Sequence, residues 1–365
     1  MKIKVDGNRL QDGLRKVIGV ANAKITPPIL GNVMLEAKDG KVNLTATNLD
    51  VTLITSVECE VEEAGATTVP AKMFQSVVAA LPVGTVEINS STMDKMRVIG
   101  GETSFKISGI AATEFPKLAK VKDDCVFTME AKDLKTALRK TAYAQSTEDV
   151  RRTLKGIHFD FAGDQLKTVA TDGRRLAVSL VKAKWKCKDT KFTIPTDAVR
   201  EVQKLIADDG TVTIKYSGNM AVYEIEKAAT TMYCKTAEDG YPNYANVIPK
   251  ETQFTATCDR ERFIDMMNRA KVMAVNNTPS VKLVFDKGTL DATVVGMDEG
   301  EGRDKFAIKY DGEKMEKVFN PYYLHETLSS IDADDVKVEM SENGPIIVKG
   351  DGESGLAVVM PLRLG

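Results

Sequence analysis

The sequence predicts an α+β protein built from three repeated domains, each with two helices packed on antiparallel sheet. Three observations lead to this prediction. The chain has 365 residues, whereas a single hydrophobic core stops growing at roughly 250 to 300 residues. A marker segment returns at a constant interval along the chain. Within each interval, two amphipathic helical patterns accompany short runs of strand-like alternation.

The marker segment has a proline or an asparagine at its centre, and the central positions are spaced by 125 residues: Pro70, Pro195 and Asn320. An internal repeat of this length predicts one domain per interval. The predicted domains cover residues 1–120, 126–248 and 253–365. They join near 119–125 and 249–253, where polar residues interrupt the alternation.

Each repeat opens with a helix that has one apolar stripe, which predicts that one face packs on a sheet. The stripes are Leu10, Leu14, Val17 and Ile18, then Leu134, Ala137, Leu138 and Thr141, then Phe263, Met266, Met267 and Ala270. A second helix follows each marker segment, with the apolar residues Met73, Phe74, Val77, Val78 and Leu81, then Val199, Val202, Leu205 and Ile206, then Leu324, Leu328 and Ile331. In the third repeat, Asn320 is a favourable N-cap and Pro321 takes the first helical position.

Short alternating strands fill the rest of each repeat. Residues that favour tight hairpin turns separate them, at Asp39-Gly40, Asp172-Gly173, Ser217-Gly218, Asp286-Lys287-Gly288 and Asp351-Gly352. The strands are therefore expected to pair antiparallel.

The composition is typical of a soluble cytoplasmic protein. No apolar run approaches the ~20 residues of a membrane span, and the N-terminus alternates like a strand and lacks the pattern of a signal peptide. The five cysteines include no C-x-x-C pair, so neither a disulfide framework nor a zinc site is expected. The net charge of −2 argues against a protein that grips nucleic acid through bulk charge, and any DNA contact must be local and weak.

The motifs of common enzyme classes are missing from the sequence. His158 lies in a strand-like run and His325 on a helix, and both are expected to be structural. The sequence has no phosphate-binding loop and no serine-nucleophile motif. The acidic run at 298–304 lacks calcium-loop spacing and is expected to be a solvated loop. These absences predict a scaffold without catalysis, cofactor or metal. A hydrolase or transferase on repeated α+β units, and a scaffold that does not encircle DNA, are the alternatives.

Several stretches make the chain similar, from end to end, to one known family. They are Pro28-Ile29-Leu30-Gly31-Asn32, Gly65 to Lys72, Thr168 to Ala177, Tyr241-Pro242-Asn243-Tyr244 and Val358 to Leu364. In these stretches, in its length and in its triplicated plan, the chain resembles the bacterial sliding clamps, the beta subunits of DNA polymerase III. The resemblance implies a head-to-tail homodimer that closes a ring around duplex DNA and confers processivity. It also implies tethering of the DNA polymerase III core, the clamp loader and other clamp-motif proteins. The subunit boundary would include Phe105, Val272 and Met273.

The resemblance places DNA-contacting residues at Lys24, Lys72, Arg151 and Arg152. The family often has glutamine where this chain has Glu148, and tyrosines where it has Arg152 and Thr153, so the DNA contact there is expected to differ. The polar faces of the opening helices are also basic, with Arg15 and Lys16, then Lys132, Lys135, Arg139 and Lys140, then Arg262 and Arg269.

The resemblance further implies a hydrophobic pocket, between the second and third domains, that accepts a short peptide from partner proteins. Matching positions are Leu154, Thr171, Gly173, Arg174, Arg175, Leu176, Pro242, Val247, Asn320, Tyr323, Gly344, Val359, Met360, Pro361, Leu362 and Arg363. The almost wholly apolar tail would be costly if it were left loose, which predicts that it is ordered. Three departures from the family, Asn246, Leu362 and the added Gly365, are expected to alter the affinity of the pocket.

Overall fold

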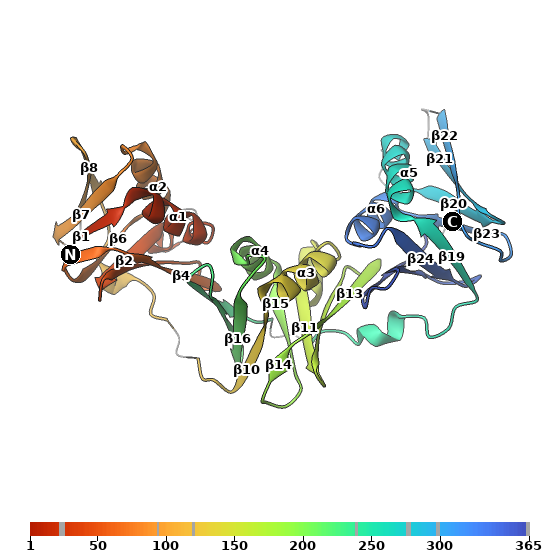
Figure 1. Ribbon diagram of the computed structural model, residues 1–365, viewed down its shortest axis with the longest axis horizontal. Helices are drawn as coiled ribbons and strands as arrows, with labels where there is room; N and C mark the ends of the chain where they lie inside the picture. Colours follow the sequence, from red (N-terminus) through yellow and green to blue (C-terminus); the bar gives the residue numbers. More distant parts are fainter. Residues whose placement is uncertain are drawn as a thin grey trace. The chain divides into compact units, whose positions relative to one another are not determined.

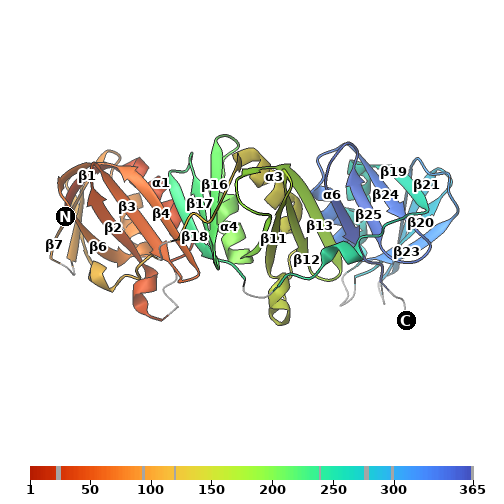
Figure 2. The ribbon, with the colours of Figure 1, turned by 90° about the horizontal axis from the view of Figure 1, so that it is seen from below.

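The computed structural model describes residues 1–21, 26–92, 95–118, 121–237, 240–274, 279–296 and 300–362, with the backbone alone at 91–92, 149, 152 and 295–296 (Figures 1 and 2). The chain forms two compact units. The first comprises Met1–Lys135, Ala183–Lys188 and Asp197–Glu238, and the second comprises Thr136–Lys182, Asp189–Thr196 and Asp239–Gly365. The middle repeat is therefore shared between the two units.

The first unit consists of two antiparallel sheets with helices. Its strands are β1 (Lys2–Asp6), β2 (Asn32–Lys38), β3 (Lys41–Thr47), β4 (Val51–Glu58), β5 (Glu60–Glu63), β6 (Gly65–Pro70), β7 (Thr85–Thr92), β8 (Lys95–Gly100), β9 (Thr103–Ser108), β10 (Cys125–Glu130), β14 (Lys184–Trp185), β16 (Thr211–Ser217), β17 (Met220–Ile225) and β18 (Thr230–Lys235). Its helical elements are α1 (Gly7–Val17), η1 (Pro28–Gly31), α2 (Ala71–Ala80), η2 (Ala112–Glu114) and nearly all of α4 (Thr196–Leu205). Helix α3 (Ala131–Ala142) contributes residues to both units.

The larger sheet of the first unit crosses a repeat boundary. Its strand order is β14-β10-β16-β17-β18-β4-β3-β2-β6, and the smaller sheet has the order β5-β1-β7-β8-β9. Strand β18 of the second repeat pairs with β4 of the first, with Thr230 opposite Thr55. In Figure 2 these strands lie side by side as one surface. The pairing explains why half of the middle repeat is compact with the first.

The second unit repeats this plan. Its strands are β11 (Gly156–Ala162), β12 (Gln165–Thr171), β13 (Arg175–Lys182), β15 (Thr190–Pro195), β19 (Phe254–Asp259), β20 (Val281–Asp286), β21 (Thr289–Gly296), β22 (Gly300–Ala307), β23 (Met315–Phe319), β24 (Asp335–Met340), β25 (Ile346–Gly350) and β26 (Leu356–Val359). Its helical elements are η3 (Asp149–Leu154), η4 (Tyr244–Val247), α5 (Arg260–Met273) and α6 (Pro321–Ser329). The sheets have the orders β15-β11-β12-β13-β26-β25-β24-β19 and β22-β21-β20-β23. Strand β13 of the second repeat pairs with β26 of the third.

The predicted helix stripes are confirmed except at three residues. Leu10, Leu14 and Val17 are fully buried on α1, which packs on β3 and β4 and lies beside α2 (Figure 1). The approach to the sheet is close, because a Cβ on Gly13 would lie 2.6 Å from the Val57 side chain. The equivalent stripes on α3 and α5 are also buried, as are those of α4 and α6. The exceptions are Met73, which is 55% exposed on α2, and Ile18 and Val77, which are only partly buried.

The turn predictions are confirmed as well. Asp39 and Gly40 both have positive φ between β2 and β3, and the glycines of the other four predicted turns have φ values between 61° and 81°. The acidic-loop prediction was wrong from Gly300 onward, because Gly300–Ala307 form β22. Residues 298–299 lie outside the described residues.

The chemistry of the described residues is simple. Cys59, Cys234 and Cys258 are free thiols, and burial raises the pKa of Cys234 and of Cys258 to about 12. Within the described ranges, no three His, Cys, Asp or Glu side chains are grouped so that they could hold a metal ion. None of the helices described is both long and apolar enough to cross a bilayer.

Candidate functional site

The candidate peptide site is built on three neighbouring strands of the second unit. Antiparallel pairing sets Thr171 of β12 opposite Leu176 of β13, and Leu176 opposite Val358 of β26. Leu176 and Val358 are each 1% exposed. The Met360 amide donates a hydrogen bond to the Arg174 carbonyl at 2.9 Å, which continues the ladder beyond the last strand. This hydrogen bond holds the apolar tail at Met360 against the β12–β13 turn.

The turn between β12 and β13 is held by its own side chains. The Asp172 carboxylate accepts hydrogen bonds from the amides of Arg174 and Arg175 at 2.8 and 2.9 Å. The Thr171 hydroxyl donates to the Arg175 carbonyl at 2.6 Å and accepts from the Gly173 amide at 3.0 Å. Gly173 has φ +81°, and a Cβ there would lie 2.5 Å from the Arg151 guanidinium. A non-glycine residue would therefore be strained.

Arg175 is a buried hub beneath this turn, with 8% of the residue exposed. Its Nε donates to Asp172 at 3.2 Å, its Nη2 donates to the Tyr143 carbonyl at 2.7 Å, and its Nη1 donates to Glu326. All three guanidinium nitrogens thus have partners within the protein. Arg175 supports the site and has little capacity to contact a ligand.

Arg174 has a different environment, with 53% of its side chain exposed. Its Nη1 lies 3.4 Å from the Tyr323 hydroxyl of α6 and 3.4 Å from a Glu148 oxygen. The other Glu148 oxygen lies 3.3 Å from Arg151 Nε. Arg151 also donates to the Asp172 carbonyl. Glu148 stands where the family often has glutamine, and its carboxylate joins Arg151 to Arg174.

A segment between β18 and β19 covers the outer face of the same sheet. Tyr241, Tyr244 and Ile248 pack against a buried cluster formed by Val169, Leu176, Val178, Ile347 and Val358. Pro242 and Val247 belong to this segment and are exposed, Val247 to 50%. Met360 is 42% exposed on the tail. Leu176 thus lies in an apolar floor, and the exposed apolar side chains come from the linking segment and the tail.

The other predicted pocket residues lie on nearby elements of the second unit. Asn320 caps α6 by accepting a hydrogen bond from the Tyr322 amide at 2.9 Å. The Leu362 amide donates to the Val318 carbonyl at 2.7 Å, and the Gly344 carbonyl accepts from Lys317 at 3.2 Å. Leu154 ends η3, Val359 ends β26, and Pro361 follows Met360. Arg363 lies outside the described residues.

The structure describes the side chains of two of the four residues that are predicted to contact DNA. Lys72 is exposed in the first turn of α2, and Arg151 is half-buried against Glu148. Lys24 and the Arg152 side chain lie outside the described residues. Most of the basic residues on the opening helices are paired with acids: Lys135 with Asp208, Arg139 and Lys140 with Asp332, Lys140 with Glu353, Arg269 with Asp304 and Arg15 with Asp12. These helix faces are therefore less positive than the sequence suggested.

The residues predicted at the subunit boundary lie on or near two edge strands. Strand β9, which includes Phe105, is an edge strand, and so is β22. Phe105 is 36% exposed, and Val272 is 73% exposed near the end of α5. An apolar hollow of about 120 Å³ lies between α5 and β22, lined by Met266, Ala270, Met273, Ala292, Val294 and Gly302, with Arg269, Arg303 and Asp304 also at its wall. Edge strands leave backbone groups unpaired and are suited to pairing with another chain.

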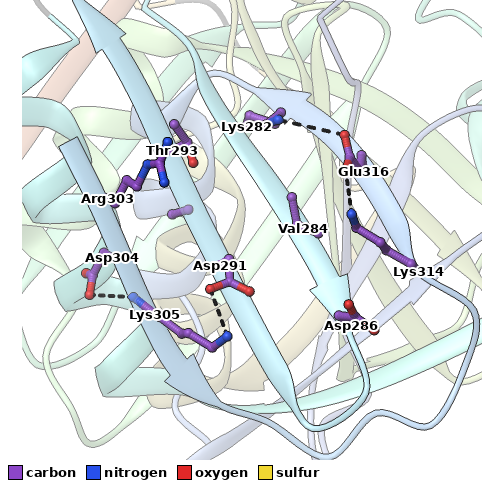
Figure 3. Close-up of a pocket in the computed structure, with 11 residues that line it drawn as sticks. Lys282, Val284, Asp286, Asp291, Thr293, Arg303, Asp304, Lys305, Lys314 and Glu316 are labelled. Carbon is purple, nitrogen blue, oxygen red and sulfur yellow. Dashed lines mark hydrogen bonds and ion pairs between the residues drawn. The ribbon is translucent and has the colours of Figure 1, made fainter. Parts of the chain in front are cut away.

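A wider hollow of about 650 Å³ lies on one face of the β22-β21-β20-β23 sheet (Figure 3). Its charged side chains form pairs: Lys305 lies 3.3 Å from Asp291, and Glu316 lies 3.2 Å from Lys314 and 3.8 Å from Lys282. Since opposite charges alternate across it, this hollow presents no concentrated charge of either sign. It does not coincide with any predicted site.

We did not predict from the sequence that His158 and Asp160 contact the segment between β18 and β19, which carries exposed residues of the candidate site. Both are polar, yet they are 8% and 4% exposed on β11, and Tyr241 and Tyr244 cover them. A signal was present in Gly156-Ile157-His158-Phe159-Asp160-Phe161, where polar residues alternate with apolar ones on a strand buried on both faces. Periodicity alone cannot say what covers the polar face.

Comparisons with known proteins give one consistent result. Models of the DNA polymerase III beta subunit match residues 1–119 as its N-terminal domain, 128–243 as its central domain and 245–363 as its C-terminal domain. The beta sliding clamp of Chlamydia pneumoniae is 29% identical over 365 residues, covering 100% of this chain and 99% of that protein. The beta sliding clamp of Escherichia coli K12 is 28% identical over 370 residues, covering 100% of both. A crystal structure of a DnaN sliding clamp from Bartonella birtlesii, bound to griselimycin, has a TM-score of 0.94 and 30% identity, covering 100% of both chains.

Proposed function

Because the chain belongs to the family of DNA polymerase III beta subunits, we infer that it is a DNA sliding clamp. The observation that carries this conclusion is the full-length match in sequence and structure, with three domain models in order along the chain. Its three domains combine helices with antiparallel sheets, and we retain 1–120, 126–248 and 253–365 as their proposed boundaries. The proposed role is to encircle duplex DNA and tether the replicative polymerase, without chemistry of its own. Its proposed location is the cytoplasm.

The proposed assembly is a head-to-tail homodimer. Strand β9 of one protomer would pair with β22 of its partner, and Phe105 would enter the apolar hollow beside Met273. Two different surfaces then meet at each boundary, and such contacts close a ring when the rotation between copies permits it. The solvent-exposed edges and the exposed Val272 support this assignment.

The proposed DNA contacts are few and weak. Each neutralised phosphate strengthens binding and its dependence on salt, so a protein that slides benefits from few contacts. Lys24, Lys72, Arg151 and Arg152 remain the proposed contacts. The pairing of Glu148 with Arg151 and the acidic partners of the opening helices favour weak binding, as does the net charge of −2.

The proposed peptide site takes a short segment that carries apolar side chains from partner proteins such as the DNA polymerase III core and the clamp loader. The buried Leu176 would support the site from beneath, and Val247 of the linking segment and Met360 of the tail would offer exposed apolar side chains. A tethered partner that releases DNA rebinds at a high effective concentration, which raises processivity without any bond chemistry.

The test is topological. The protein is loaded on a nicked circular plasmid by a bacterial clamp loader with ATP, and the bound fraction is isolated by gel filtration. Retention on the circle and loss after linearisation are expected, because an open end lets a ring slide off. Equal retention on circular and linear DNA would instead indicate ordinary binding. A dimer mass by light scattering is expected in parallel, and a monomer would contradict the ring.

A further inference from the structure

Two polar residues, His158 and Asp160, are buried on the outer face of β11. His158 and Asp160 are two residues apart and therefore point to the same side of the strand. Phe159 and Phe161 point to the opposite side, into the core, and are fully buried. His158 is 8% exposed and Asp160 is 4% exposed. The linking segment between β18 and β19 provides the cover.

Two tyrosines of that segment contact the pair directly. The Tyr241 ring stacks on the His158 ring, with centroids 4.6 Å apart and planes 9° apart. The Tyr244 hydroxyl donates a hydrogen bond to Asp160 Oδ2 at 2.9 Å, and the Tyr244 ring meets His158 edge-on at 6.3 Å. Burial and the hydrogen bond to Asp160 both raise the pKa of Tyr244, so its hydroxyl remains a donor at neutral pH.

The Asp160 carboxylate depends on this contact. Its Oδ2 accepts from Tyr244 and lies 2.9 Å from Lys191 Nζ, whereas its Oδ1 has no hydrogen-bond partner within the described residues. The Lys191 side chain is 59% exposed, so its ion pair is screened by water. Without the Tyr244 hydroxyl, this buried carboxylate would lose a neutral hydrogen-bond donor, which is costly. The hydrogen bond therefore fixes where the segment docks.

The docked segment continues into the peptide site. Pro242 follows the stacked Tyr241, and Val247 ends the helical turn that Tyr244 begins. The Tyr241 hydroxyl is buried near the Thr171 backbone, at the end of β12, without a hydrogen bond of normal geometry. A shift of either tyrosine would therefore move the exposed wall relative to Leu176.

We propose that His158 and Asp160 are positioning residues for the peptide site: through Tyr241 and Tyr244 they hold Pro242 and Val247 over the outer face of the sheet. This inference rests on the proposed function of that site. It assigns to a polar contact on the second repeat the placement of one wall of the peptide site, and it requires no contact between either residue and the peptide.

The test uses the full chain and a synthetic peptide with a glutamine followed by two large hydrophobic residues. Tyr244→Phe removes only the hydroxyl that Asp160 accepts, and Tyr241→Leu removes the stacked ring. Tyr241→Phe keeps the ring and serves as the conservative rescue. Tyr233→Phe, on β18 of the other unit, is the matched control. Calorimetry gives the peptide affinity, thermal unfolding gives stability, and hydrogen–deuterium exchange follows the amides of residues 243–248.

We expect peptide binding about tenfold weaker in Tyr244→Phe and Tyr241→Leu, with faster exchange at 243–248 and intact dimers. Tyr241→Phe and Tyr233→Phe should bind as the unchanged protein does. Unchanged affinity in both Tyr244→Phe and Tyr241→Leu would overturn the positioning role and leave the peptide site standing. Weaker binding without faster exchange at 243–248 would also overturn it. Failure of the unchanged protein to bind the peptide would instead overturn the proposed site.

Discussion

The guanidinium of Arg175 lies over the ring of Tyr323, with its central carbon 4.6 Å from the ring centroid, and joins β13 of the second repeat to α6 of the third. It also lies 5.1 Å from the centroid of the Tyr143 ring. The planar cation thus contacts two aromatic rings while all its nitrogens are hydrogen-bonded. A lysine could not reproduce this geometry, because it has neither the plane nor the fork of donors.

Arg175→Lys is therefore expected to destabilise the protein by about 2 kcal/mol, measured by urea unfolding. Half of the Glu326 side chain is exposed, which keeps the loss below that of a wholly buried ion pair. Arg200→Lys, which alters the exposed pair with Asp197, is the control and should change stability by less than about 0.5 kcal/mol. Similar stability in both variants would contradict the assignment of Arg175 as a hub.

Phe105→Asp and Met273→Asp are each expected to give monomers by light scattering. Either change would bury an unpaired carboxylate at the proposed subunit boundary, which costs more than the boundary can offset. Val83→Asp introduces the same charge on a side chain that is 91% exposed, and its dimer should persist. Dimers in both boundary variants would show that the boundary lies elsewhere.

The DNA contacts can be tested in two directions. Alanine at Lys24, Lys72, Arg151 and Arg152 together should weaken DNA association and flatten its dependence on salt. Glu148→Gln should have the opposite effect, because it releases Arg151 and Arg174 from their carboxylate. Fluorescence anisotropy at several salt concentrations gives both slopes, and Glu58→Gln, at a more exposed acid that is paired with Arg9, is the control. A salt slope that neither variant changes would remove these residues from the interface.

The pH dependence of stability should report on His158. The pKa of His158 is lowered from 6.5 to about 4, mainly by burial, with the charge of Asp160 opposing the shift and the charge of Lys191 adding to it. Between these values the unfolded chain binds a proton that the folded chain does not, so stability falls as the pH drops from 6.5 to 4. The loss amounts to at most about 3 kcal/mol. His158→Phe keeps an aromatic ring against Tyr241 but cannot titrate, so its stability should fall less over this range in urea unfolding. Parallel pH curves for the two proteins would contradict the buried neutral imidazole.

Local sequence patterns predicted the helices and turns of this fold. The pairing of strands that are distant in the sequence could not be predicted from such patterns. The stripes with Leu134 and Phe263 predict helix faces because their spacing follows the helical period. The cap at Asn320 follows from its neighbour Pro321. By contrast, the pairing of β4 with β18 joins segments about 175 residues apart, and no local pattern encodes it. The same limit applies to Glu148, whose partner Arg174 comes close only once β12 and β13 have paired.

The last prediction concerns the tail. Ending the chain at Val359 removes the hydrogen bond from the Met360 amide to Arg174 and that from the Leu362 amide to Val318, but leaves buried Val358 and Val359 in place. Stability should therefore fall by only about 1 to 3 kcal/mol, with the dimer intact.

The synthetic peptide with a glutamine followed by two large hydrophobic residues should bind this shortened chain at least about tenfold more weakly, because an exposed apolar wall of the site is gone. Met360→Ala separates the two effects. Because it keeps both backbone hydrogen bonds, it should weaken binding of the peptide without lowering the stability of the protein. Met73→Ala, at another exposed methionine, is the control and should change neither quantity. Calorimetric titration of all four proteins decides the matter. Equal affinity for the intact and shortened chains would exclude the tail from the site, and loss of the dimer on shortening would show that the tail is structural.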